Sequence, residues 1–440
     1  MRTRVLATLL GAAFAIGAPC AAHADDLLQY YREALSNDAQ FGSARSLFRA
    51  NQEKLPQGQA GMLPQVSLSG LMSRTHADIE NRALPDTWKN YYTYTYTLQL
   101  TQPLFRWSNL QQVEIGKLSV LLAEAQLGQA GQDLAVRVAQ AYFDVLATED
   151  NITFITAQKA AITEQLASAK RNFEVGTATI TDTNEAQARY DLAVASELAA
   201  RNDLNIKRTN LQQIIGRPPG LVAPLRAGVE LTQPAPLNIE PWVENAEKGN
   251  FGVLQQQANL EIAGRNIEVN RAGRYPNIDL IASRGLNKTP VTSPVLSTTA
   301  SVIGVQLSIP LYTGGLAESR IRESIALHER SEQDLENSRR VAAQAARQAF
   351  FGVNSGLSQI KALQAAETSS LTALESNRLG YEVGVRINID VLNAQQQLFQ
   401  TRRDLAKARY DTLMNSLRLK SATGALKEDD LGLINGLLAR

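Results

Sequence analysis

The residues whose types and spacing could do chemistry surround two copies of a Val-Gly pair, FEVGTATITDTNEAQARYD and YEVGVRINIDVLNAQQQLF. In the first copy, Asp182 is followed three residues later by Glu185, which predicts that Asp182 caps a helix in a capping box. In the second, Arg386 stands four residues before Asp390, so a helix would place both charges on one face as a local ion pair. These patterns predict polar ties at helix ends.

Nothing in the sequence predicts catalysis. His76 and His328 have no Cys, His or carboxylate cluster at metal-ligand spacing, and no phosphate-binding or dinucleotide fingerprint occurs. We therefore expect no enzyme activity, no metal and no cofactor. The 44 basic and 43 acidic residues nearly cancel, so no global basic field argues for a nucleic-acid partner.

The first 24 residues have the pattern of a secretory signal. Arg2 and Arg4 precede an apolar run, and Ala22-His23-Ala24 is a small-residue cleavage site. We expect cleavage between Ala24 and Asp25. A retained anchor is the alternative, but the run is shorter than the about 20 residues that span a bilayer. Lipid attachment at Cys20, the only cysteine, is a second alternative, and its sequence context is poor.

Proline placement predicts long helices. All fifteen prolines lie before residue 104 or between 218 and 310, which leaves two long blocks free of proline. Both blocks are rich in Ala, Gln, Glu, Leu and Arg, with apolar residues spaced three and four apart. Each block is interrupted once, by Val175-Gly176 or by Val383-Gly384, at a constant offset of 208 residues. The chain is therefore an internal duplication, with a helix of about 65 residues in each copy.

Each copy also supplies two strands. Strict alternation over YYTYTYTLQL indicates a strand, and its aromatic and leucine face could be covered by protein core or by lipid. The residues of that face are Tyr92, Tyr94, Tyr96, Leu98 and Leu100. The four strands are expected near residues 64–74, 91–102, 276–286 and 299–309. Four strands do not close a membrane barrel, whereas two chains would give eight and three would give twelve.

Taken together, these features resemble the TolC family of outer-membrane efflux and secretion channels. The resemblance rests on QPLF before a long helix, the duplicated VGT and VGV turns, and YEVGVRINIDVLNAQQQL followed by ARYDTLMNSLRLKSATGAL. It implies a mainly α fold with a transmembrane β-barrel portion: a homotrimer in the outer membrane of a Gram-negative cell, with a twelve-stranded barrel continued by a periplasmic α-helical barrel. The implied parts are a signal peptide (1–24), a first repeat (25–216), an equatorial connecting segment (217–248), a second repeat (249–425) and a C-terminal equatorial tail (426–440).

The resemblance also implies roles for single residues. A periplasmic gate would join Tyr381 and Arg386 to Thr181 and Asp182. Asp390 would form an acidic ring at the entrance, and Asn393 stands where the family has a second acid. The turns that would dock an adaptor are Val175, Gly176, Val383 and Gly384. The face of the strand over residues 92–100 would meet outer-membrane lipid, with tyrosines near the interface.

The implied function is the exit duct of a tripartite export machine. Its partners would be a periplasmic adaptor protein and an inner-membrane transporter, of either the proton-driven RND class or the ATP-driven ABC class. The cargo would be drugs or secreted polypeptides, and the sequence does not choose between them. A soluble periplasmic coiled-coil adaptor or scaffold is the alternative, although it would not need strands with an aromatic face. A secreted enzyme would need a polar constellation that the sequence lacks.

Overall fold

The computed structural model describes residues 25–81, 84–226, 228–289 and 296–439. The predicted signal and its cleavage residue Ala24 lie outside the described residues. The described part of the chain begins at Asp25. The first half contains α1 (Leu27–Asn37), α2 (Ala39–Gln52), α3 (Lys54–Ala60), β1 (Gln65–Asn81), β2 (Leu84–Phe105), α4 (Trp107–Glu174) and α5 (Ile180–Ile215). The second half contains α6 (Glu240–Gly249), α7 (Phe251–Arg271), a 3-10 turn (Ala272–Arg274), β3 (Asn277–Thr289), β4 (Leu296–Ser308), α8 (Leu316–Glu382), α9 (Asn388–Ala422) and α10 (Glu428–Asn435).

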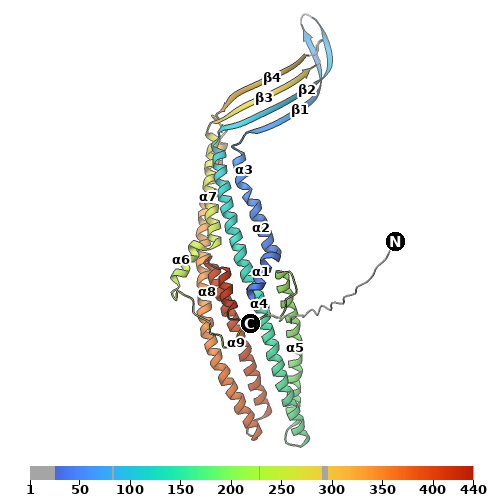
Figure 1. Cartoon of the computed structure of the whole chain (residues 1–440), viewed down its shortest axis with the longest axis vertical. Coiled ribbons are helices and arrows are strands. Elements are labelled where there is room, and N and C mark those ends of the chain that lie inside the picture. The colour runs from blue at the N-terminus through green and yellow to red at the C-terminus, as the bar shows by residue number, and fades with distance from the viewer. Residues whose placement is uncertain (1–24, 82–83, 227, 290–295, 440) are drawn as a thin grey trace, which may run out of the picture.

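Two long helical hairpins dominate the molecule (Figure 1). Helices α4 and α8 contain 68 and 67 residues, which confirms the predicted length of about 65. At ~1.5 Å per residue each is about 100 Å long. Each runs from the sheet to a Val-Gly turn and returns as α5 or α9, and both tips lie at the end of the molecule farthest from the sheet. None of the described helices is both long and apolar enough to cross a membrane.

The strands form one antiparallel sheet in the order β1-β2-β3-β4, so the two repeats meet where β2 pairs with β3. The four predicted strands are confirmed, and β1 and β2 extend farther than predicted. The predicted strands ended where the alternation of apolar and polar side chains fades, but the main-chain hydrogen bonds between strands do not require that alternation. At the base of the sheet, Arg106 donates two hydrogen bonds to Asp279 of β3, 2.8 and 2.6 Å long, which fix the start of α4 to the sheet.

The largest buried core lies at mid-height, where α1, α10 and the segment after α5 cover α4 and α9. Leu27, Tyr30 and Tyr142 are fully buried there. The Tyr142 hydroxyl donates to the carbonyl of Ala223 at 2.7 Å, which satisfies its polar atom inside the core. Asn435 of α10 donates to Asp26 beside α1 at 2.8 Å, so the last helix is fixed to the first.

Candidate functional site at the hairpin tips

The two turns have the same backbone geometry. Gly176 and Gly384 both have a φ of 78°, and each donates to the carbonyl three residues earlier, while the next residue donates to the carbonyl five residues back. This is a Schellman motif, whose left-handed position favours glycine. A Cβ on either glycine would meet no atom of the chain within 4 Å. The tips also carry exposed apolar side chains, which are Phe173, Val175, Ile180, Val383, Val385 and Ile387.

Helix α5 is capped by Thr179, so the prediction that Asp182 is its N-cap was wrong. The Thr179 hydroxyl accepts from the backbone N–H of Asp182 at 3.3 Å, and the Asp182 carboxylate accepts from the backbone N–H of Thr179 at 3.0 Å. Asp182 is therefore the third-position partner in the capping box. Thr179 has the extended backbone of an N-cap, whereas Asp182 lies inside the first turn of α5. The Thr-x-x-Asp spacing of this capping box is visible in the sequence.

Arg386 and Tyr381 make different contacts within one chain. The Arg386 guanidinium, in the turn before α9, lies 3.7 Å from the carboxylate of Asp390 in the first turn of α9; the local pair that the sequence allowed is present, although the two residues do not share a helix. The Tyr381 hydroxyl accepts from the side-chain amide of Asn172 on α4 at 3.2 Å. Among the described residues of one chain, neither side chain is paired with Thr181 or Asp182. The polar contacts of Arg386 and Tyr381 with Thr181 and Asp182 stay a prediction for the assembled trimer.

Three polar residues at the tips were missed by the sequence reasoning. Asn388, the first residue of α9, accepts a hydrogen bond from Gln165 of α4 and donates to the main-chain carbonyl of Asp182 at 3.4 Å. Arg189 of α5 donates to Asn393 at 3.1 Å, so the residue expected in the entrance ring is held by a cation of the α4–α5 hairpin, which we call the outer hairpin; the α8–α9 hairpin is called the inner hairpin. Comparison of the two repeats could have pointed to Asn388, because this polar residue occupies the position that apolar Ile180 has in the first copy.

The sheet separates apolar and polar side chains onto two faces. One row of paired residues across the four strands is apolar, namely Val66, Leu100, Ala282 and Ile303. The neighbouring row, which points to the other face, is Ser67, Gln99, Ser283 and Val302. The apolar face includes the predicted residues 92, 94, 96 and 98, and Arg284 and Lys288 of β3 interrupt it. The strand face named from the sequence therefore continues across the sheet in the row of Leu100, whereas the row of Leu98 meets Arg284 on β3 and Ser301 on β4.

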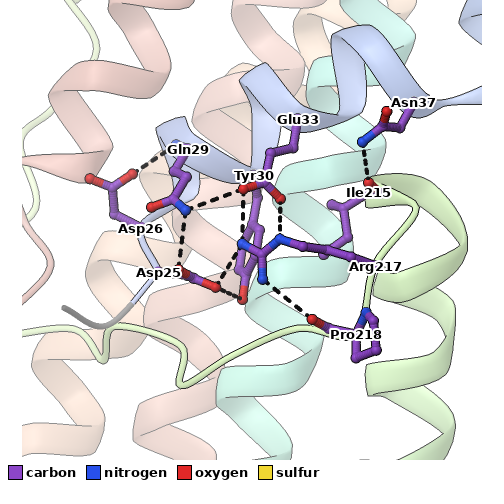
Figure 2. A network of polar contacts seen from close by, with 9 residues as sticks. All are labelled: Asp25, Asp26, Gln29, Tyr30, Glu33, Asn37, Ile215, Arg217 and Pro218. Atoms are coloured by element: carbon purple, nitrogen blue, oxygen red, sulfur yellow. Dashed lines mark hydrogen bonds and ion pairs between the residues drawn. The ribbon is translucent and has the colours of Figure 1, made fainter. Parts of the chain in front are cut away.

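A polar network fixes the start of the described chain to the segment after α5 (Figure 2). The Arg217 guanidinium donates to Asp25 at 2.9 Å and to both carboxylate oxygens of Glu33 at 2.8 Å. The Tyr30 hydroxyl donates to the same Asp25 oxygen at 3.0 Å. The main-chain N–H of Asp25 also donates to Leu221 at 2.8 Å. Burial alone would raise the pKa of Asp25, but the hydrogen bonds from Arg217 and Tyr30 outweigh it and lower that pKa.

Arg217→Ala should lower the free energy of unfolding of the detergent-solubilised protein by about 1–3 kcal/mol, because it leaves the mostly buried carboxylates of Asp25 and Glu33 without their cation. Since the folded pKa of Asp25 lies below the unfolded value, the network stabilises the fold above about pH 4. That contribution is lost as the pH falls through the lower, folded pKa. Melting curves of both proteins between pH 2 and 7 should therefore converge at the acid end. Lys248→Ala, which removes an exposed ion pair with Glu244, is the control and should change little.

The arrangement of this chain matches solved outer-membrane channels. VceC of Vibrio cholerae superposes with a TM-score of 0.77 at 18% identity, over 90% of this chain and 96% of that one. The channel OprN gives 0.79 at 17% identity, over 91% and 90%. In sequence, the alkaline protease secretion protein AprF of Pseudomonas aeruginosa is 32% identical over 99% of this chain and 92% of its own length. TolC of Escherichia coli is 29% identical over 99% and 90%.

These similarities define the class as outer-membrane efflux and secretion channels. The chain belongs to the outer membrane efflux protein family, whose sequence model matches residues 30–217 and 242–425. It is thus an outer-membrane channel protein with a periplasmic helical extension, and the comparisons support this reading over a soluble coiled-coil adaptor. Among the described residues, no group of three His, Cys or carboxylate side chains could hold a metal ion.

Proposed function

We propose that three copies of this chain form one exit duct through the outer membrane. The observation that carries the proposal is the sheet of the described chain, which has β1 at one edge and β4 at the other without a further partner. A bilayer core offers no water to an open edge, so each β1 must pair with the β4 of a neighbour. Three copies give the twelve-stranded barrel that the family resemblance implies, and a soluble adaptor would leave this sheet without a role.

The barrel would turn the apolar rows of the sheet toward lipid. Tyr92 and Tyr96 are exposed in the single chain, as a lipid-facing surface requires. Tyrosine favours the membrane interface, where its ring meets the acyl chains and its hydroxyl meets water. The rows of Ser, Thr, Gln and Gly on the other face would line an aqueous lumen.

The hairpin tips would form a gated periplasmic entrance. In the trimer, Arg386 and Tyr381 of one chain would meet Thr181 and Asp182 across the boundary between hairpins. Arg386 is 58% exposed on its side chain, so it is free to exchange its 3.7 Å local contact for such a tie. Asp390 would supply one acidic ring, and Asn393, held by Arg189, would add no second one. A single ring should attract cations less strongly than two.

The duct would receive its cargo from a periplasmic adaptor and an inner-membrane transporter. The exposed apolar residues at the tips support a partner there, because such patches mark contact surfaces. Names of relatives include proteins for protease secretion and for efflux, so either an ABC or an RND transporter fits.

Crosslinking in living cells followed by affinity purification tests the proposal. We expect native mass spectrometry to find three chains, and the crosslinked material to contain one adaptor and one inner-membrane transporter. The class of the co-purified transporter, ABC or RND, would identify the energy source, and the compounds or polypeptides bound by that transporter would identify the cargo. Recovery of monomers alone in detergent, at every protein concentration, would overturn the exit-duct assignment.

A further inference from the structure

The start of α9 is fixed to the outer hairpin by one buried amide. Asn388 is only 1% exposed, although it is polar and lies at a helix start. Its side-chain oxygen accepts from the Gln165 amide on α4, and its nitrogen donates to the carbonyl of Asp182 on α5. One side chain of the inner hairpin therefore contacts both helices of the outer hairpin.

This contact exists in only one of the two repeats. At the offset of 208 residues, the counterpart of Asn388 is Ile180, which is 51% exposed, and the counterpart of Gln165 is Ala373. The caps differ in parallel. Helix α5 begins with the Thr179 capping box, whereas Ile387 gives α9 no side-chain cap. The Asn388 amide is thus not a general feature of the hairpin fold, and it serves no cap of its own helix.

Neighbouring contacts extend the same face of α9. Leu392, one turn beyond Asn388, packs against Ile162 and Leu166 of α4 and Ala186 of α5 in a small buried cluster. Arg189 donates to Gln396 at 2.5 Å, in addition to its bond with Asn393. We call the set of Asn388, Gln165 and Arg189 the tip latch. It joins the inner and outer hairpins within one chain.

We propose that the tip latch, through Asn388, positions α9 and gives the periplasmic entrance two discrete states. The inference rests on the proposed gate and adds to it. An exposed tie such as Arg386 can weaken gradually, because water replaces its partner. The hydrogen bonds of a buried amide do not weaken gradually, since a small shift of α9 would leave the donor and the acceptor without a protein partner and without access to water. Intermediate positions are therefore disfavoured, and α9 either stays seated or leaves the outer hairpin altogether.

The test compares Asn388→Leu and Gln165→Leu with the parent in planar bilayers. Loss of one net hydrogen bond shifts an equilibrium about fivefold, so three symmetric copies should raise the open-to-closed ratio about a hundredfold. Asn388→Leu removes both hydrogen bonds of that side chain and Gln165→Leu removes one of them, so the double variant should conduct like Asn388→Leu alone. Ile180→Leu, at the matching site of the first repeat, is the control and should conduct like the parent. Arg386→Glu is recorded in parallel.

The possible outcomes separate the two levels of the proposal. If Asn388→Leu and Gln165→Leu conduct like the parent while Arg386→Glu opens the channel, the latch is wrong and the gate stands. If none of the three changes conductance, the gate fails as well. A merely structural role for Asn388 would reduce the yield of trimers but leave the conductance of the surviving trimers unchanged, and that result would also overturn the latch. Should Asn388→Leu yield no trimers, Gln165→Leu, on the half-buried surface of α4, decides the question.

Discussion

Cells whose only copy of this channel carries Gly384→Trp should assemble trimers in the outer membrane and export almost nothing. Gly384 has a φ of 78°, and a Cβ there meets no atom of the chain within 4 Å. The indole would therefore point away from the protein, and the backbone strain of a non-glycine residue should cost only about 1–2 kcal/mol per chain. A partner seated on the turn would meet the indole directly. Gly176→Trp should have the same effect in the outer hairpin.

The control for this experiment is Gly314→Trp, at the other end of α8. Gly314 also has a positive φ, 62°, and open space at its Cβ, so the substitution imposes similar backbone strain far from the tips. Export is measured as the accumulation of a fluorescent efflux substrate and as the amount of secreted protein, with trimers counted in isolated outer membranes. Normal export by both tip variants would exclude the turns as the docking site. Loss of export in all three variants would assign the defect to strain.

Helices and strands that are specified by a pattern within their own segment were predictable from the sequence. A proline-free block of helix formers is sufficient to define α4, and the alternation of tyrosine and threonine defines β2. The duplication then transferred both assignments to the second half. At the tips, the glycine turns were predictable because a left-handed residue at a helix end strongly favours glycine. The cap was assigned to the wrong residue, since two candidates three residues apart, Thr179 and Asp182, both had suitable side chains and spacing.

Contacts between distant parts of the chain were not predictable. Gln165 and Asn388 are 223 residues apart, and Asp25 and Arg217 are 192 apart. Periodicity assigns a residue to a face of its own element, but it does not say which other element covers that face. The same limit applies to Arg386. Its spacing to Asp390 predicts the local pair that one chain contains, and a tie across hairpins depends on how chains assemble.

Replacing Arg386 with Glu separates these two accounts of the gate. If Arg386 holds the entrance closed by pairing with Asp182 across hairpins, Arg386→Glu turns attraction into repulsion at three symmetric sites. Each partly solvated pair contributes at most about 1 kcal/mol, so the loss of three attractions should shift the open-to-closed ratio by up to about a hundredfold, and the new repulsion adds to that shift. Single-channel recordings in planar bilayers should then show a raised conductance, and Tyr381→Phe should add to it, because it removes the hydroxyl that the gate account pairs with Thr181 and Asp182.

Asp390→Ala is the matched variant, because it removes the local partner of Arg386 and leaves the cation in place. Under the gate account it frees Arg386 for the tie across hairpins, so the resting conductance should stay low. Block by multivalent cations from the periplasmic side should weaken, since the acidic ring is gone. Under the local account Arg386 and Asp390 act only on each other, and both variants should conduct alike. An Arg386→Glu channel that conducts like the parent would therefore leave the 3.7 Å pair as the whole role of Arg386.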